Sequence, residues 1–200
     1  MRRADGKPLL EYVLDALSFI GKDNTILVVG YKKEDILTRF GGYPFAVQER
    51  QLGTGHAVMA ASDELRGFDG GVLVCCGDMP LIGRETYEML VSVHFGGGSA
   101  CTILSGTSDI PLPYGRIVRD GKGEFLKLVE EKDASPEELE IRELNSGVYI
   151  FDAQKLLPAL TDLKNNNAQG EYYLTDVPAI LRAGGESVSL CKLELGSSLI

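Results

Sequence analysis

The sequence predicts an α/β protein with a mainly parallel, doubly wound sheet. Apolar runs of strand length, such as 71–76 (GVLVCC), alternate with segments of helical spacing through the first half of the chain. Within 8–20, apolar residues recur at i, i+3, i+4 and i+7, which predicts an amphipathic helix. Strands that alternate with helices predict βαβ units, whose parallel strands are buried between helices. The length of 200 residues allows one domain with a sizeable core.

Each element is predicted from its local pattern. Helices are expected at 8–20, about 33–38, 54–65, 84–94, about 153–161 and 171–182. Strands are expected where apolar or β-branched residues run together between turn residues, at 25–29, 45–48, 71–76, 100–104, 115–118, 125–129 and 143–151. From about Pro111 the pattern changes, which predicts a mixed or antiparallel extension that carries the other wall of a cleft.

Charge, apolar runs and cysteine positions indicate which kinds of partner the protein can bind and in which cell compartment it is expected. The formal net charge of −9 argues against nucleic acid, because phosphate neutralisation needs a basic face. A nucleotide ligand is still compatible with this charge, since nucleotide sites use backbone N–H groups, a few cations and often a metal. No apolar run could span a bilayer and no signal cleavage pattern follows the N-terminus, so we expect a cytoplasmic protein without a membrane partner. Cys75 and Cys76 lie in an apolar run, which predicts small core residues in a reducing compartment.

The segment 51–57 (QLGTGHA) places two glycines around Thr54 where a helix is expected to begin. Glycine lets the backbone approach a ligand closely, and Thr54 can cap the helix while N–H groups face an anion or a base edge. The alternative is an ordinary helix start. His56, taken alone, is more typical of a packing or surface residue than of a catalyst.

The segment 72–81 (VLVCCGDMPL) ends an apolar strand at Gly77 and Asp78. In open α/β sheets, ligands bind outside the carboxyl ends of the strands. A carboxylate there is well placed to hold Mg²⁺, which prefers oxygen ligands and shares them with substrate phosphates. The alternative is an aspartate that caps the next turn.

Further polar residues lie in strand contexts at 114–116 (YGR), 129–133 (VEEKD) and 143–147 (ELNSG). Each of these, taken singly, could be a turn or the solvated face of a strand. The segment 165–176 (NNNAQGEYYLTD) gathers donors, acceptors and two aromatic residues at a helix start. Such density suits a hydroxyl-rich ligand, because a sugar needs paired hydrogen bonds on several edges.

Together these segments resemble the uridylyltransferase domain of the bacterial bifunctional N-acetylglucosamine-1-phosphate uridylyltransferase/glucosamine-1-phosphate acetyltransferase family. The shared blocks keep the family's order across residues 6–176, and they are GKPLLEYVLDAL, QERQLGTGHAV, CGDMPLI, YGRIVR, VEEKDAS, ELNSG and NNNAQGEYYLTD. The resemblance implies a Rossmann-like nucleotidyltransferase fold in one domain, 1–200, with a nucleotide-binding half at 1–110 and a sugar-binding half at 111–200.

The resemblance also implies residue roles. The nucleotide would contact Gln48, Gly53, Thr54, Cys76 and Gly77, and Asp78 would be a ligand of Mg²⁺. The N-acetylglucosamine moiety would be surrounded by Gly115, Glu130, Asn145, Tyr173 and Thr175.

The implied reaction is attack of a sugar 1-phosphate oxygen on the α-phosphorus of UTP. N-acetylglucosamine 1-phosphate would become UDP-N-acetylglucosamine, a cell-wall precursor, and pyrophosphate would leave. No covalent enzyme intermediate is needed, so catalysis would depend on positioning and charge neutralisation. The family's trimer needs a C-terminal domain that has no counterpart here, so no oligomeric state is predicted.

Departures from the family pattern lead us to expect a chain truncated at both ends. The family opens with a strand, the glycine-rich loop L-A-A-G-x-G-T-R-M and a P-K pair, whereas this chain reaches the GKP block at Gly6. The loop, its arginine, the lysine, a second metal ligand in an E-G-V-N-N segment and the acetyltransferase β-helix have no counterpart. We therefore assign no catalytic residue and expect little turnover. We also expect coding DNA upstream of Met1 to encode the loop in frame.

The strand without a counterpart would be central, between 25–29 and 71–76. Its buried side chains would each contribute about 1.5–3 kcal/mol, against a net stability of about 5–15 kcal/mol. We therefore expect either a destabilised chain or closure of the gap by the two flanking strands.

Other functions compete with this interpretation. One is a related sugar-1-phosphate nucleotidyltransferase on the same fold, and another is a non-catalytic remnant that binds a UDP-sugar. A nicotinamide dehydrogenase is disfavoured, because no G-x-G-x-x-G follows any predicted strand.

Overall fold

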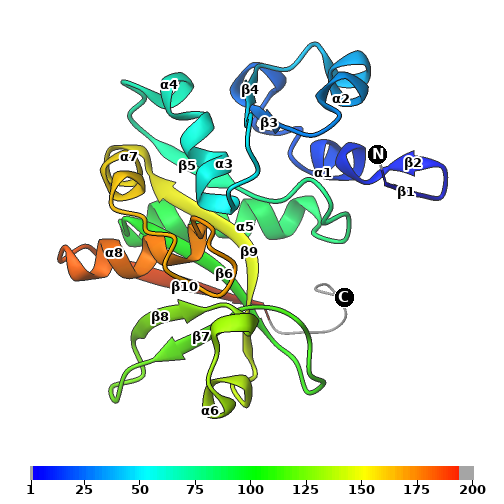
Figure 1. Cartoon of the computed structure of the whole chain (residues 1–200). Coiled ribbons are helices and arrows are strands. Elements are labelled where there is room, and N and C mark those ends of the chain that lie inside the picture. Colours follow the sequence, from blue (N-terminus) through cyan, green and yellow to red (C-terminus); the bar gives the residue numbers. More distant parts are fainter. Residues whose placement is uncertain (1, 194–200) are drawn as a thin grey trace.

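A six-stranded sheet forms the centre of the molecule (Figure 1). The computed structural model describes residues 2–193 of the chain. The strand order is β10-β6-β9-β7-β8, and β5 pairs with β9 on the edge opposite β6. The strands are β5 (Gly71–Val74), β6 (Cys101–Thr107), β7 (Arg116–Arg119), β8 (Phe125–Val129), β9 (Glu143–Asp152) and β10 (Val188–Leu193).

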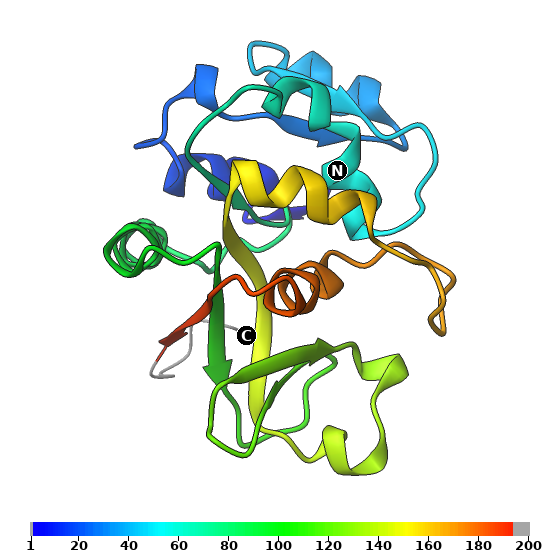
Figure 2. The ribbon, with the colours of Figure 1, turned by 90° about the vertical axis from the view of Figure 1, so that its left-hand side faces the viewer.

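Strand β9 makes the sheet mixed. It runs antiparallel to β5, β6 and β7, whereas β10 and β6 are parallel. The predicted α/β class is therefore confirmed, but the sheet is mixed: β10 and β6 pair in parallel, and β9 separates β6 from β5 and runs antiparallel to both. The antiparallel hairpin of β7 and β8 supplies the extension predicted after Pro111. Figure 2 shows β9, in yellow, running from the region of α7 down to this hairpin.

A second, two-stranded sheet lies at the opposite end of the molecule from the β7–β8 hairpin (Figures 1 and 2). Strands β3 (Leu27–Val29) and β4 (Phe45–Val47) pair in parallel, and α2 (Lys33–Phe40) connects them. Strand β3 does not pair with β5. The expectation that these two strands close the gap between them is therefore wrong, since each keeps its own sheet.

The helices match the predicted segments with shifts at their ends. Helix α1 (Leu9–Ala16) is shorter than 8–20, and the predicted helix 54–65 is divided at Ala61. The start predicted at residue 171 is wrong, because Tyr172 donates its backbone N–H to the carbonyl of Leu52 and the chain becomes α-helical only at Val177. The remaining helices are α3 (Thr54–Ala60), α4 (Ser62–Leu65), α5 (Arg84–Gly97), α6 (Pro136–Leu139), α7 (Ala153–Thr161) and α8 (Val177–Ala183).

The β1–β2 hairpin, helix α6 and strand β10 were not predicted from the sequence. Strands β1 (Arg3–Ala4) and β2 (Lys7–Pro8) form a hairpin whose two turn residues, Asp5 and Gly6, have φ of 48° and 77°. Strand β10 lies at the edge of the main sheet.

Alternating side chains of β9 enter two different cores. Tyr149 and Phe151 join the cluster that includes Leu156 of α7 and Val177 of α8. Val148 and Ile150 join the cluster that includes Leu90 of α5. Because helices cover both faces, seven of the ten residues of β9 are buried and the other three are half-buried, as expected for a strand between two layers.

No helix in residues 2–193 is long and apolar enough to cross a membrane. The four cysteines are free thiols. Cys101 and Cys191 are buried, and burial raises the pKa of Cys75 to about 12, as expected for a core thiol. Cys76 is exposed, so the expectation that it packs in the core is wrong; it lies just beyond the end of β5.

Candidate functional site

Backbone hydrogen bonds hold the start of α3 against the segment that precedes α8. Gly55 donates its backbone N–H to the carbonyl of Tyr172 at 2.8 Å, and Tyr172 donates in turn to Leu52 at 2.8 Å. Gly53 has φ of +109°, and a Cβ atom added there would lie 2.6 Å from the Tyr172 carbonyl oxygen. The glycine is therefore required both by its backbone conformation and by the close approach of this second segment.

Thr54 and Gln48 hold this junction from two sides. The Thr54 hydroxyl accepts the backbone N–H of Leu174 at 3.0 Å. The Gln48 amide nitrogen lies 3.0 Å from the carbonyl of Gly53 and 3.0 Å from Nδ1 of His56. Because an amide nitrogen donates, Nδ1 accepts in this arrangement, which places the imidazole proton on the other nitrogen. His56 thus orients Gln48; the sequence predicted a packing or surface residue but not this partner.

The residues predicted to surround a sugar come together beside β9. The Thr175 hydroxyl donates to the Glu130 carboxylate at 2.9 Å. The Asn145 backbone N–H donates to the carbonyl of Gly115 at 2.9 Å. A Cβ atom at Gly115 would lie 3.7 Å from the second Glu130 oxygen. Four segments that are distant in sequence therefore meet around one carboxylate.

Buried hydrogen bonds fix the position of this group. Asn145, only 6% exposed, donates from its side chain to the Tyr149 hydroxyl at 2.6 Å. Its side-chain oxygen accepts the N–H of Gly147, which has φ of +79°. Burial raises the pKa of Tyr149, and the nearby Glu130 carboxylate adds to that increase. Tyr149 was not predicted as a site residue; the signal that could have found it is the glycine inside a strand pattern, which marks a local irregularity.

Tyr173 lies on the segment 171–175, which links the residues at the start of α3 to those around Glu130. It is 5% exposed, and its hydroxyl accepts a hydrogen bond from the Gln169 side chain at 3.0 Å. The loop before it is fixed by Asp133, whose carboxylate accepts the backbone N–H of Ala168 at 2.8 Å. The segment 171–175 thus contacts α3 with its first residues and Glu130 with its last.

Acidic groups accumulate next to Thr175. Burial raises the pKa of the Asp176 carboxyl group, and the negative charges of Glu130 and Asp133 raise it further. Three carboxylates therefore share this side of the site. Neutral hydroxyl and amide groups of a ligand would be accepted here more readily than a further anion.

Asp78 lies apart from these carboxylates, at the carboxyl end of β5. Cys76, Gly77 and Asp78 are all exposed. The following residue, Met79, has its sulfur 4.0 Å from the Cβ position of Gly147, so the end of β5 lies against β9 near Asn145. Within residues 2–193 no group of three His, Cys, Asp or Glu side chains is arranged to hold a metal by itself. A lone exposed carboxylate fits an ion such as Mg²⁺, which usually keeps its waters and binds one or two carboxylates together with phosphates.

Within the polar block at 114–116, Arg116 supports the site rather than lining it. Arg116 is 4% exposed, and its guanidinium donates to the backbone carbonyls of Leu112, Tyr114 and Leu139. These bonds fix the loop that precedes Gly115 and connect it to the end of α6. The alternative of a solvated strand face is therefore wrong for Arg116.

Comparison with known families and sequences gives one consistent result. The model of the MobA-like NTP transferase domain matches residues 1–169. The chain is 49% identical over 185 residues to the bifunctional protein GlmU of Geobacillus thermodenitrificans, which covers 92% of this chain and 40% of that protein. It is 45% identical over 195 residues to the bifunctional protein GlmU of Pelotomaculum thermopropionicum, which covers 97% of this chain and 43% of that protein. The chain thus spans about two fifths of the length of these relatives.

The fold is also similar to a solved structure. The nucleoside-diphosphate-sugar pyrophosphorylase of Vibrio cholerae RC9 superposes with a TM-score of 0.67 over 97% of this chain and 83% of its own. The sequence identity is 15%, so this similarity concerns the fold alone.

Proposed function

We propose, since this chain belongs to the MobA-like NTP transferase domain family, that it provides the uridylyltransferase part of an enzyme that makes UDP-N-acetylglucosamine. The substrates would be UTP and N-acetylglucosamine 1-phosphate, and the second product would be pyrophosphate. The observation that carries the proposal is the hydrogen-bonded pair of Glu130 and Thr175, which meets Gly115 and Asn145 beside β9. Relatives at 45–49% identity carry the name of a bifunctional protein, and the region shared with them contains all of these residues.

The sugar side suits a neutral, hydroxyl-rich group. One Glu130 oxygen accepts from Thr175, which leaves the other free to accept from a sugar hydroxyl. Gly115 leaves open the space that a side chain would fill next to that oxygen. Asn145 and Tyr173 are held by Tyr149 and Gln169, so they would need little reorganisation on binding.

The nucleotide side would use Gln48, Gly53 and Thr54 at the start of α3. Gly53 allows the close approach of Tyr172, which brings segment 171–175 next to the start of α3. The Thr54 oxygen is occupied by Leu174, but its own proton is available for donation to the ribose or base. Because Leu174 precedes Thr175 directly, the same segment would contribute to both halves of a UDP-sugar site.

In the proposed reaction, an oxygen of the sugar 1-phosphate forms a bond to the α-phosphorus of UTP. The bond from that phosphorus to the oxygen of the β-phosphate breaks, and pyrophosphate leaves with the electron pair. No proton transfer to an enzyme group is required. The chain's residues would hold the two substrates in line and exclude water between them. Mg²⁺, held by Asp78 at the carboxyl end of β5, would supply neutralisation of the phosphate charge.

Calorimetry on the purified chain tests the binding part of the proposal. UDP-N-acetylglucosamine is expected to bind more tightly than UDP-glucose, which lacks the acetamido group, and more tightly than GDP-mannose. Equal affinity for all three nucleotide sugars, or no binding of any, would contradict the proposed specificity.

A coupled assay for pyrophosphate release from UTP and N-acetylglucosamine 1-phosphate tests the reaction. Tight binding of UDP-N-acetylglucosamine without pyrophosphate release would favour the second candidate, a binding module. The variant Asp78→Asn should lose the Mg²⁺-dependent part of UTP binding. Asp69→Asn, an exposed aspartate before the other end of β5, serves as the matched control and should leave UTP binding unchanged.

A further inference from the structure

Strand β9 changes its register against β6 next to Asn145. Tyr149 lies opposite Ile103 and Asn145 lies opposite Ser105, so two steps along β6 correspond to four steps along β9. The additional residues form a bulge of β9 at 146–148. Bulges occur next to binding sites, where they turn a side chain in a new direction. This bulge lies directly after Asn145, which is a proposed sugar contact.

The hydroxyl group of Ser146 takes the place of a ladder hydrogen bond at the bulge. Ala100 of β6 accepts the backbone N–H of Asp152 at 2.9 Å, and backbone groups alternate between the two edges of a strand, so the Leu104 carbonyl also points to β9. Ser146 donates its hydroxyl to that carbonyl at 2.8 Å and accepts the backbone N–H of Val148 at 3.2 Å. Leu104 and Val148 are fully buried, and Ser146 is 2% exposed. One hydroxyl thus pairs a buried acceptor with a buried donor.

The bulge sets the direction of the Asn145 side-chain amide. The Asn145 side-chain oxygen accepts the N–H of Gly147 at 3.1 Å, and Gly147 turns the chain there with φ of +79°. Since a backbone N–H only donates, the amide oxygen of Asn145 faces the bulge and its nitrogen donates to the Tyr149 hydroxyl at 2.6 Å. A primary amide has a second N–H, which can be donated to a ligand. A change in the bulge would therefore turn this donor.

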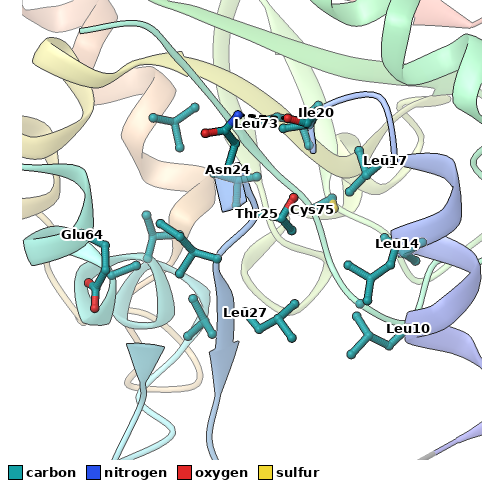
Figure 3. Close-up of a pocket in the computed structure, with 18 of the residues that line it drawn as sticks. Leu10, Leu14, Leu17, Ile20, Asn24, Thr25, Leu27, Glu64, Leu73 and Cys75 are labelled. Atoms are coloured by element: carbon teal, nitrogen blue, oxygen red, sulfur yellow. Dashed lines mark hydrogen bonds between the residues drawn. The ribbon is translucent and has the colours of Figure 1, made fainter. Parts of the chain in front are cut away.

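The bulge also separates two parts of β9 that have different neighbours. Before the bulge, β9 pairs with β7, which belongs to the hairpin beside the sugar residues. After the bulge, residues 149–152 pair with β5. Figure 3 shows Leu73 of β5 and Cys75 lining an apolar cavity with Leu17 at the end of α1, and all three pack in one hydrophobic cluster. The bulge therefore sets how the sugar residues lie relative to β5, which leads to Asp78.

We propose that Ser146 is a positioning residue: its hydroxyl fixes the bulge of β9 and thereby sets the Asn145 amide relative to Asp78 at the end of β5. The inference rests on the proposed function, which assigns these two residues to the two ends of one UDP-sugar. Ser146 itself does not touch the ligand, because its hydroxyl is used inside the sheet. Without that hydroxyl, two buried backbone groups of Leu104 and Val148 lose their partner, and the bulge shifts to pair them again.

Nuclear magnetic resonance of the unliganded chain tests the effect on the bulge. In Ser146→Ala, the side-chain amide signals of Asn145 should shift, and the backbone N–H of Gly147 should exchange with solvent about tenfold faster or more. Ser99→Ala is the matched control, since Ser99 is also buried, at 7% exposed, and its hydroxyl bonds to that of Ser189 on β10 at 2.6 Å. The control should leave both signals unchanged. Unchanged Asn145 and Gly147 signals in Ser146→Ala would overturn the proposal.

Calorimetry tests the effect on the ligand. Ser146→Ala should bind UDP-N-acetylglucosamine about tenfold more weakly than the parent chain. The affinity for UMP should change by less than about twofold, because UMP has no N-acetylglucosamine group to contact Asn145. A serine that only stabilises the fold would lower the Tm and leave the ratio of the two affinities as it is in the parent chain. An unchanged ratio would therefore overturn the proposal.

Rescue and a ligand-free readout complete the test. Ser146→Thr restores the hydroxyl and should return the ratio of the two affinities toward the parent value; if this variant does not fold, the comparison of Ser146→Ala with Ser99→Ala decides alone. A folded Ser146→Thr with the same ratio as Ser146→Ala would contradict a role of the hydroxyl. A parent chain that binds UMP but not UDP-N-acetylglucosamine would refute the proposed function. In that case the Asn145 and Gly147 signals still decide whether Ser146 fixes the bulge.

Discussion

The side-chain oxygen of Thr54 accepts the backbone N–H of Leu174 at 3.0 Å and so joins the start of α3 to the segment before α8. This bond connects the residues proposed for the nucleotide to those proposed for the sugar. Thr54 therefore has a structural task in addition to its proposed contact with the ligand. The structural contribution of Thr54 can be measured as the stability of the unliganded chain, and it can thus be separated from the contribution of Thr54 to ligand binding.

Substitution Thr54→Val removes the acceptor of the Leu174 N–H and keeps the side-chain shape. An unsatisfied buried donor costs about 1–3 kcal/mol, so we expect the free energy of unfolding of the unliganded chain to fall by about 1 kcal/mol or more in urea denaturation. Thr38→Val is the control, since the Thr38 hydroxyl only donates to Glu34 in its own helix. An equal fall in the free energy of unfolding for the two variants would show that the Thr54–Leu174 bond stabilises the chain no more than the bond of Thr38 within its own helix.

Substitution Gly53→Ala should be more damaging than substitution of another glycine with positive φ. The added methyl would lie 2.6 Å from the carbonyl oxygen of Tyr172, whereas Gly67, with φ of +77°, has nothing within 4 Å of its Cβ position. Gly67→Ala should therefore cost only the backbone strain, about 1 kcal/mol. Gly53→Ala should cost at least about twice as much, measured as a lower Tm. Equal shifts in Tm would mean that the segment at Tyr172 moves away at no cost.

Substitution Thr175→Val should weaken sugar recognition while leaving the fold intact. It removes the hydrogen bond to Glu130 at 2.9 Å, so the carboxylate would lose its fixed orientation. We expect the affinity for UDP-N-acetylglucosamine to fall by about tenfold, which corresponds to about 1.4 kcal/mol, and the affinity for UMP to change little. Thr107→Val is the control, because the Thr107 hydroxyl has no hydrogen-bond partner in residues 2–193. A parallel loss of UMP affinity would place Thr175 outside the sugar part of the site.

Substitution Asp176→Asn should stabilise the unliganded chain at neutral pH. Burial and the charges of Glu130 and Asp133 raise the pKa of Asp176 in the folded state. A raised folded pKa means that the folded chain binds more protons than the unfolded chain between the two values, so stability falls as pH rises through that interval. The penalty grows as pH rises through that interval and vanishes in acid, below the ordinary pKa of an aspartate.

Thermal unfolding between pH 3 and pH 8 checks this expectation. The Tm of Asp176→Asn should exceed that of the parent chain at pH 7, and the two values should converge toward pH 3. Asp69→Asn, an exposed loop residue, should show no such pH-dependent difference. A lower Tm for Asp176→Asn at pH 7 would indicate that the carboxylate makes a stabilising contact instead.

Local patterns predicted most of the elements but not their ends. The apolar runs at β5, β8 and β9 and the helical spacing of α5 and α7 were sufficient, because each element buries its own periodic face. The helix predicted from residue 171 failed because main-chain bonds between Tyr172 and the start of α3 hold that segment extended. No local pattern contains this information, since the partners come from segments far apart in the chain.

The hairpin β1–β2 and strand β10 carried signals that went unused. Asp5 and Gly6 form the residue pair typical of a tight hairpin turn, and the sequence of β10 alternates apolar and polar residues at its start. The direction of β9, by contrast, could not be predicted from any local signal. Strand patterns give burial but not direction, so the mixed character of the sheet depended on long-range pairing.

The same limit applied to the site. The resemblance placed Gly115, Glu130 and Asn145 in separate motifs, but their common location beside β9 depends on the pairing of β7 with β9. Tyr149 was not predicted as a supporting residue, and the partner of His56 was not predicted, because such partners are known only once the chain is folded.

The antiparallel position of β9 has a consequence for synthesis on the ribosome. Among residues 2–193, strand β5 forms its ladder only with residues 149–152, and β6 pairs with 143–151, so neither strand can enter the sheet when it first leaves the exit tunnel. At roughly 5–20 residues per second, the roughly 75 residues between Val74 and Tyr149 take several seconds to be made. During that interval the apolar edges of β5 and β6 are open to chaperones and to self-association, and release of β9 is the event that ends this exposure.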